Sequence, residues 1–324
     1  MKARRRLLGV LAAGPLAAAA GSAWWYASRN RIPDVVRIGV GQPLTGGALA
    51  AFGQDVLNGA NMAVDDINAG TGLKIGGKAV RLEIVVADDH GKPEDGKVAA
   101  AQLVQQDVVA VIAHLDSGTS IAAAPVYAAA GVPQLAFSTN PQYTQLKLPT
   151  TLRLIANDDL QARAMAKVAA GLTGASKFAV VDNGTLYGKE LSGAAEKVLG
   201  ELGKSVVLRR SLEEKSTDLT ALVRELAAVG PDVLVSTLSD FQIVALMPQL
   251  AAAGLSNIQI VGGNRLKTKR LADAQIPVRA VIATSPIVDA QDFGRGVPSS
   301  LPGTTHASRA MQSTWLTTRT TRCN

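Results

Sequence analysis

The segment from Val108 to Thr144 constrains the fold more than any other part of the chain. Val108–Ala113 is a continuous apolar run, as expected for a strand that is buried on both faces. We predict a helix that begins with Asp116 or Ser117 as its N-cap and ends at Gly131, followed by a second strand over Val132–Phe137. A strand, helix and strand in this order predict a parallel sheet covered by helices.

Polar residues follow both of these predicted strands. The run D-S-G-T-S starts at Asp116, and the run S-T-N-P starts at Ser138. Open α/β sheets bind small ligands at the carboxyl ends of their strands, and helix N-termini there favour a carboxylate or phosphate. We therefore predict a small-molecule site where these two runs lie side by side.

The same alternation continues along the chain, in two series separated near Asn157-Asp158-Asp159, where we place a hinge. Strands that alternate with helices of about 10–15 residues predict parallel sheets, and two series joined by hinges suit a cleft that closes on a ligand. The expected fold class is thus α/β, with two Rossmann-like lobes. Our boundaries are 1–31 for an export signal, 32–157 for lobe 1, 158–284 for lobe 2, 285–293 for a return to lobe 1, and 294–324 for a tail.

The first 31 residues have the pattern of an export signal. A basic start with Lys2 and three arginines precedes an apolar stretch over residues 7–20, and Gly21-Ser22-Ala23 offers small residues for cleavage. The alternative is an uncleaved anchor, because Trp24-Trp25-Tyr26 would suit a membrane interface. Either case predicts a periplasmic protein.

The formal net charge of +7 is concentrated at the two ends of the chain. Six basic residues precede residue 32 and four follow Phe293, with no acidic residue in either segment, which leaves residues 32–293 at −3. A slightly acidic core gives no reason to expect nucleic acid as a partner. Cys323 is the only cysteine, so no internal disulfide can form.

Short motifs occur in the order G-V-G-Q-P-L-T-G, F-G-Q, N-G-A-N-M-A-V-D-D-I-N-A-G, V-V-A-D-D, H-L-D-S and S-T-N-P-Q-Y-T within residues 39–144, and the matches as a whole extend over about residues 36–293. Together they resemble the type I periplasmic binding proteins of the Leu/Ile/Val-binding family. The resemblance implies a receptor that captures an amino acid, amide or organic acid between two lobes and delivers it to the permease of an ABC importer. The alternative is a ligand-sensing module of the same fold that acts on a signalling partner.

The resemblance also implies a ligand site. Ser117, with Leu115 and Asp116, would hold the α-carboxylate of a ligand, and Phe137, Ser138 and Thr139 would help to hold the carboxylate and the amine. Tyr187 would reach across from lobe 2, and Phe52 would line an apolar pocket. Each position also has an ordinary structural explanation: an N-cap for Ser117, a turn before Pro141 for Thr139, the start of a helix for Tyr187 and core packing for Phe52.

Asn264 departs from the pattern of the family, which often has a glutamate in this loop to pair with the ammonium of the ligand. An amide accepts a hydrogen bond but supplies no countercharge. Asp240, in the S-D-F sequence, is the nearest acidic substitute that we identify. The departure keeps an amide, a carboxylate or an aromatic acid open as ligands.

We find no enzyme motif and expect no cofactor or metal. Gly39, Gly41 and Gly46 lack the spacing of a dinucleotide site, and the three histidines lack metal-ligand spacing. His114, Asp116 and Ser117 are too close in sequence for a hydrolase triad. The tail over 294–324 has seven threonines, four arginines and no acidic residue, so we expect a truncated or frame-shifted end, with a natural disordered tail as the alternative.

Overall fold

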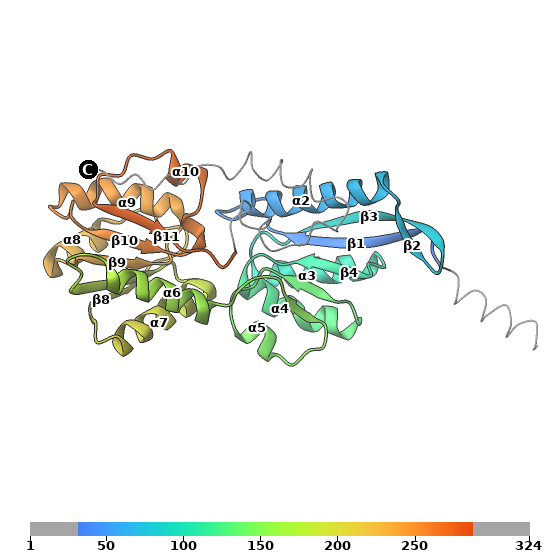
Figure 1. Ribbon diagram of the computed structural model, residues 1–324, viewed down its shortest axis with the longest axis horizontal. Coiled ribbons are helices and arrows are strands. Elements are labelled where there is room, and N and C mark those ends of the chain that lie inside the picture. Colours follow the sequence, from blue (N-terminus) through green and yellow to red (C-terminus); the bar gives the residue numbers. More distant parts are fainter. Residues whose placement is uncertain (1–31, 288–324) are drawn as a thin grey trace, which may run out of the picture.

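Two parallel-sheet lobes, each covered by helices on both faces, make up the protein (Figure 1). A computed structural model describes residues 32–287 of the 324. The first sheet has the strand order β2-β3-β1-β4-β5-β6, and the second has the order β11-β10-β9-β7-β8. The α/β fold and the parallel pairing predicted from the sequence are confirmed. The export signal, residues 288–293 of the return segment and the tail lie outside the described residues.

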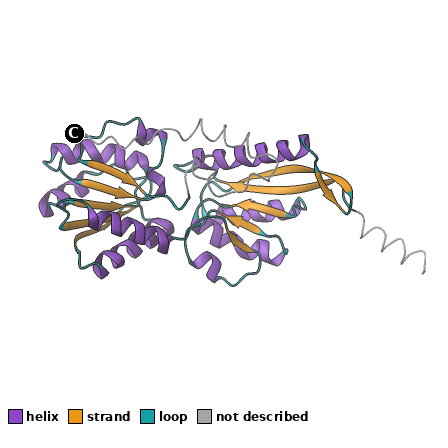
Figure 2. Cartoon of the chain, in the orientation of Figure 1, coloured by secondary structure: helices purple, strands orange, loops and turns teal. Residues whose placement is uncertain are grey.

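The first lobe contains strands β1 to β6 and helices α2 to α5 (Figure 2). Their bounds are β1 Val35–Gln42, α2 Ala50–Ala69, β2 Leu73–Ile75, β3 Lys78–Asp88, α3 Pro93–Gln105, β4 Ala110–Ala113, α4 Ser117–Ala129, β5 Gln134–Ala136, α5 Gln142–Gln145 and β6 Thr151–Arg153. Helix α2 covers one face of the sheet, and α3 and α4 cover the other. Val111 and Ala113 of β4 are fully buried beneath α3 and α4, beside Leu103 and Tyr127, which accounts for their continuous apolar run.

One strand pair differs from the predicted parallel arrangement. Strand β2 pairs antiparallel with β3, and Ile75 lies opposite Lys78. The turn between them is Gly76-Gly77, with φ values of 55° and 83°. Glycine adopts such positive φ values at no steric cost, so this dipeptide permits a tight hairpin.

The second lobe repeats the architecture of the first. Its elements are α6 Asp158–Gly171, β7 Lys177–Asp182, α7 Leu186–Glu201, β8 Ser205–Ser211, α8 Thr220–Val229, β9 Val233–Ser236, α9 Asp240–Ala252, β10 Gln259–Gly262, the 3-10 turn η1 Asn264–Leu266, α10 Lys269–Ala272 and β11 Ala280–Ala283. One face of this sheet packs against α8 and α9 and the other against α6 and α7. Fully burying a leucine contributes about 1.5–3 kcal/mol, so Leu226, Leu246 and Leu250, none of which is exposed, contribute substantially to this core.

Each sheet changes its winding direction at one point. In the first lobe β1 lies between β3 and β4, and in the second β7 lies between β8 and β9. Ligands of open α/β sheets bind outside the carboxyl ends of the strands at such points. Ser117, Tyr187 and Asp240 lie in the first turns of α4, α7 and α9, directly after the loops that follow β4, β7 and β9, so the topology places these three predicted residues at the expected edges.

The chain passes between the lobes at two neighbouring places. After β6 it enters α6, where the Asn157 side chain caps the helix by accepting from the Leu160 backbone N–H at 3.1 Å. After β11 the chain comes back to this crossing, where the Ala156 backbone N–H donates to the Pro286 carbonyl at 3.2 Å. The end of the described chain therefore lies beside the connection between β6 and α6.

Candidate functional site

Helix α4 begins at the carboxyl end of β4, with Asp116 as its N-cap. Asp116 Oδ1 accepts from the backbone N–H groups of Gly118 and Thr119, at 2.9 and 3.3 Å. The Ser117 side chain is therefore not needed as the cap. Its Oγ is buried and accepts from the Asn140 backbone N–H at 3.3 Å, which joins the first turn of α4 to the loop after β5. A hydroxyl in this position can still donate to a ligand.

The loop after β5 is held in place through its backbone, while several of its side chains have no partner. Arg153 Nη1 donates to the carbonyls of Ser138 and Asn140, each at 2.9 Å. Ser138, Thr139 and Asn140 are all buried. Ser138 Oγ and Asn140 Nδ2 have no hydrogen-bond partner among the described residues. Buried polar groups without partners are rare in folded proteins, so this loop has unused hydrogen-bonding capacity.

Asp158, the first residue of α6, is a buried carboxylate that we did not predict as a site residue. Its backbone N–H donates to the Thr139 carbonyl at 2.8 Å, but neither carboxylate oxygen has a hydrogen-bond partner of good geometry among residues 32–287. Burial raises the pKa of Asp158 to about 7, and the neighbouring Thr139 hydroxyl and Arg153 guanidinium act in the opposite direction. An ammonium group would satisfy such a carboxylate well.

From the second lobe, Tyr187 and Asn264 contact each other. The Tyr187 hydroxyl donates to Asn264 Oδ1 at 2.8 Å, and Gln161 Nε2 lies 3.4 Å from the same oxygen. Burial raises the pKa of Tyr187 above its ordinary value, so it is a neutral donor at physiological pH. Because Asn264 already accepts from Tyr187, it is poorly placed to receive a ligand ammonium.

Arg265 extends from the second lobe to the first. It is 6% exposed; its Nη1 lies 2.9 Å from Glu214 Oε1, and its Nη2 lies 3.2 Å from Asp116 Oδ2. Its Cζ atom lies 4.8 Å from the centroid of the Tyr187 ring, within the range of a cation–π contact. Burial raises the pKa of Asp116, and the Arg265 charge lowers it.

These contacts connect nine residues of the two lobes, which we call the interlobe ring; Asp158 and Gln161 are joined only through one turn of α6. In an order in which each residue is bonded to, in contact with or in the same helical turn as the next, its members are Asp116, Ser117, Asn140, Thr139, Asp158, Gln161, Asn264, Tyr187 and Arg265. Five of them were predicted as site residues: Asp116, Ser117, Thr139, Tyr187 and Asn264. The structure therefore brings these five together, and adds Asn140, Asp158, Gln161 and Arg265.

The remaining predicted residues lie outside the ring. Phe52, Leu115 and Phe137 are partly buried in the first lobe. Asp240 belongs to the second lobe, where its Oδ2 accepts from Thr268 Oγ1 at 2.9 Å and its Oδ1 lies 3.4 Å from Arg270 Nη1. Their roles in ligand binding stay predictions, although the oxygens of Asp240 already have partners.

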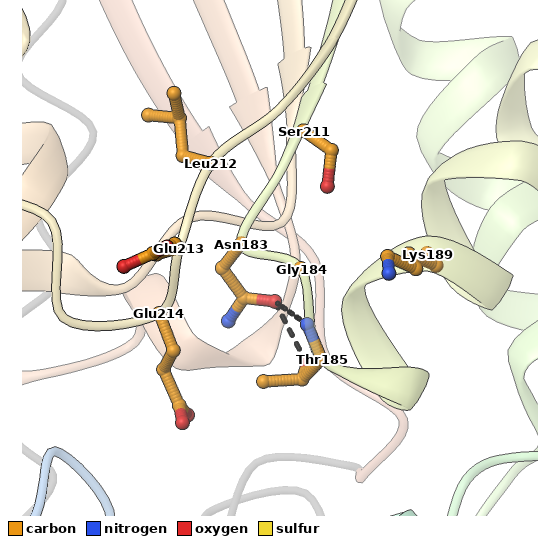
Figure 3. Close-up of a pocket in the computed structure, with 8 residues that line it drawn as sticks. All are labelled: Asn183, Gly184, Thr185, Lys189, Ser211, Leu212, Glu213 and Glu214. Carbon is orange, nitrogen blue, oxygen red and sulfur yellow. Dashed lines mark hydrogen bonds between the residues drawn. The ribbon is translucent and has the colours of Figure 1, made fainter.

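A hollow of about 450 Å³ lies beside the ring, at the carboxyl edge of the second sheet (Figure 3). Its lining includes Asn183, Gly184 and Thr185, with Lys189 of α7 on one side of them in the view and Glu213 and Glu214 on the other. Glu214 connects it to the ring through Arg265. The hollow is lined by the second lobe alone, so it does not use the polar groups of the first lobe.

Neither histidine in the described residues forms part of a metal cluster, since residues 32–287 contain no group of three or more His, Cys, Asp or Glu placed to hold an ion. His114 is fully buried and pairs with buried Asp89 at 2.6 Å, and its Nε2 lies 3.2 Å from the Tyr127 hydroxyl. This arrangement joins β4, α4 and the loop after β3, which is a structural role. Within the described range no helix is long and apolar enough to cross a membrane.

Two α/β lobes whose sheet edges meet around a ring of polar side chains define a two-lobed solute-binding protein. Residues 35–295 match the periplasmic binding protein family model, and the chain belongs to this family, of the type I fold. The resemblance read from the sequence motifs is confirmed.

Individual relatives agree with this assignment. An amino acid binding protein of Pseudomonas aeruginosa is 37% identical over 209 residues, which is 64% of this chain and 54% of that protein. Leu/Ile/Val-binding protein homolog 1 of Brucella melitensis is 30% identical over 275 residues, 85% of this chain and 70% of that protein. The chain thus spans only about half to two thirds of the length of several relatives that it matches.

Solved structures show the same fold. The leucine-binding protein LivK of Thermotoga maritima superposes with a TM-score of 0.66 at 27% identity, over 74% of this chain and 66% of that one. A solute-binding protein of an ABC transporter from Rhodopseudomonas palustris, in complex with 3,4-dihydroxybenzoic acid, gives a TM-score of 0.66 at 19% identity, over 76% of this chain and 66% of that one. At this identity the second comparison shows the fold alone.

Proposed function

We propose that this chain is the solute receptor of an ABC importer, located in the periplasm, and that it binds a small amino acid within the interlobe ring. The permease of the importer would be its protein partner. The names of the relatives support this class of function, and the P. aeruginosa and Brucella proteins are named for binding amino acids.

The main support for the proposal is a set of buried polar atoms, in and beside the ring, that have no hydrogen-bond partner among the described residues. They are Ser138 Oγ, Asn140 Nδ2, Gln161 Oε1 and both carboxylate oxygens of Asp158. They come from the loop after β5 and the start of α6, at the hinge between the lobes. Together they offer donors, acceptors and a negative charge, which suits a ligand that has both an acceptor and a cationic donor.

The charge of Asp158 favours a ligand with an amine. At neutral pH its pKa of about 7 leaves a large fraction ionised, and a neighbouring ammonium would ionise it further. Asp158 can thus supply the countercharge that Asn264 lacks. Benzoate has no cationic group and no hydrogen-bond donor to pair with this carboxylate, and a phenol such as that of 4-hydroxybenzoate supplies a donor without a countercharge.

Calorimetric titration of the exported protein tests the proposal. The panel contains leucine, isoleucine and valine, with benzoate, 4-hydroxybenzoate and urea as compounds without an α-amine. We expect one-to-one binding of at least one amino acid, and weaker binding after Asp158→Asn. The matched control is Asp159→Asn, because Asp159 is the exposed neighbour in the same helical turn. Tight binding of the aromatic acids alone would contradict the amino acid assignment.

A further inference from the structure

Asp116 places a negative charge where the proposed ligand carboxylate would bind. Its own carboxylate already accepts two backbone N–H groups at the start of α4, next to Ser117. A helix N-terminus normally attracts an anion, but two carboxylates in the first turn repel each other. Something must neutralise Asp116 before Ser117 and its neighbours can hold an anionic group.

Arg265 is the residue in position to do this. Its Nη2 lies 3.2 Å from Asp116 Oδ2, and both side chains are largely buried, with 7% and 10% of their surface exposed. Arg265 belongs to the second lobe and Asp116 to the first, so this contact exists only when the lobes are closed. Glu214, the other partner of Arg265, also comes from the second lobe and is 36% exposed, so it can hold the guanidinium when the lobes are apart.

We propose that Arg265 is a specificity-determining residue of the cleft: it neutralises Asp116 when the lobes close, and so allows the first turn of α4 to accept a ligand carboxylate. This inference rests on the proposed function. The carboxylate of the ligand then shares one guanidinium with Asp116 and Glu214, and its five N–H donors are enough for all three. A ligand whose carboxylate is converted to an amide has no need of this neutralisation.

The test compares L-leucine with L-leucinamide, and benzoate with benzamide, by calorimetric titration. The variants are Arg265→Gln, Asp116→Asn and the double variant. Asparagine is a good N-cap, so Asp116→Asn removes the charge and retains the cap of α4. Arg210→Gln is the control, since Arg210 pairs with Glu225 within the second lobe and its loss changes the net charge equally.

Arg265→Gln leaves Asp116 without its countercharge, so the carboxylates of Asp116 and the ligand, about 5 Å apart, repel each other. We therefore expect the acid of each pair to bind roughly 10- to 100-fold more weakly. The affinity for its amide should change little. The double variant should recover most of this loss, because it removes both charges. Circular dichroism of each variant confirms that it is folded.

Two results would overturn the inference. Equal weakening of acid and amide, without recovery in the double variant, would show that Arg265 only holds the lobes together. If Arg265→Gln binds the acid more weakly and the double variant does not recover the affinity, then Arg265 binds the ligand directly and the charge of Asp116 does not cause the loss. If the wild-type protein binds neither member of either pair, nor any compound of the amino acid panel, the proposed function itself fails, and this inference fails with it.

Discussion

Arg265 Nη2 and Asp116 Oδ2 lie 3.2 Å apart although 149 residues separate them in the chain. This ion pair joins the two lobes at the start of α4. Breaking a buried pair by removing one partner costs about 3–5 kcal/mol. We expect a smaller loss when Asp116 is the partner removed, because Glu214 still pairs with Arg265.

The first prediction concerns lobe closure without ligand. Arg265→Gln should increase the radius of gyration in small-angle X-ray scattering, because the closed form loses its interlobe ion pair. Arg210→Gln, whose pair lies within one lobe, should leave the radius unchanged. Identical scattering of the wild type and Arg265→Gln would show that the pair does not control closure.

The second prediction concerns the two hydroxyls of the first lobe. Ser117→Ala and Thr139→Ala should each weaken ligand binding by about 1.5–3 kcal/mol, or roughly 10- to 150-fold, as expected for a hydrogen bond to a charged group. Ser117→Ala should also lower the melting temperature of the ligand-free protein, because the Asn140 backbone N–H loses its acceptor. Unchanged affinity in both variants would remove these residues from the site.

The third prediction concerns the pH dependence of stability. Because burial raises the pKa of Asp158 from 3.8 to about 7, the folded protein keeps a proton there that the unfolded chain releases above pH 3.8. The contribution of Asp158 to stability therefore falls as the pH rises from about 4 to 7. Asp158→Asn should stabilise the ligand-free protein at pH 8, by up to about 4 kcal/mol, and make little difference below pH 4.

Denaturant unfolding at pH 4, 6 and 8 measures this effect, with Asp159→Asn as the control in the exposed position. If the difference in unfolding free energy between Asp158→Asn and the wild type is the same at all three pH values, the pKa of Asp158 is not raised.

The fold was predictable because its signals are local. Gly131 marks the predicted end of a helix, and the apolar run of β4 is that of a strand covered on both faces. Gly76-Gly77 was also a hairpin signal, yet β2 was missed because Leu73–Ile75 has only three residues and is partly exposed.

The site was predictable only in part, for a physical reason. Ser117 and Thr139 follow strands directly, so the strand pattern locates them. Asp158 has the ordinary pattern of an acidic residue in the first turn of a helix, and only the packing around it shows that it is buried without a partner. Arg265 was missed because its partner is distant in sequence and its own loop gives no sign of it.

The fourth prediction concerns the buried pair of His114 and Asp89, both fully buried and 2.6 Å apart. Asp89→Ala removes the partner of His114 Nδ1 and leaves it without a hydrogen bond in the core. A buried polar group left without a hydrogen bond lowers the unfolding free energy by about 1–3 kcal/mol, and by more if it is charged. We therefore expect a clear loss of unfolding free energy in urea, whereas Asp95→Ala, which removes a partly exposed carboxylate, should cause a smaller loss. Equal stability of the two variants would show that the pair is dispensable.

The fifth prediction concerns export, and rests on the basic and apolar start of the sequence. Cell fractionation should place the mature protein in the periplasm, with an N-terminus near Trp24 if the signal is cleaved. A membrane-bound periplasmic protein that retains residues 1–31 would favour the anchor. Recovery of the intact chain from the soluble cytoplasm would contradict export.

A crystal structure of the protein grown with an amino acid that binds it tests the central claim most directly. We predict that the ligand lies within the interlobe ring, with its ammonium in hydrogen-bonding distance of Asp158 and its carboxylate at Ser117. A ligand found instead in the hollow between Lys189 and Glu213, or one whose ammonium contacts Asp240 and leaves Asp158 without a partner, would contradict the account.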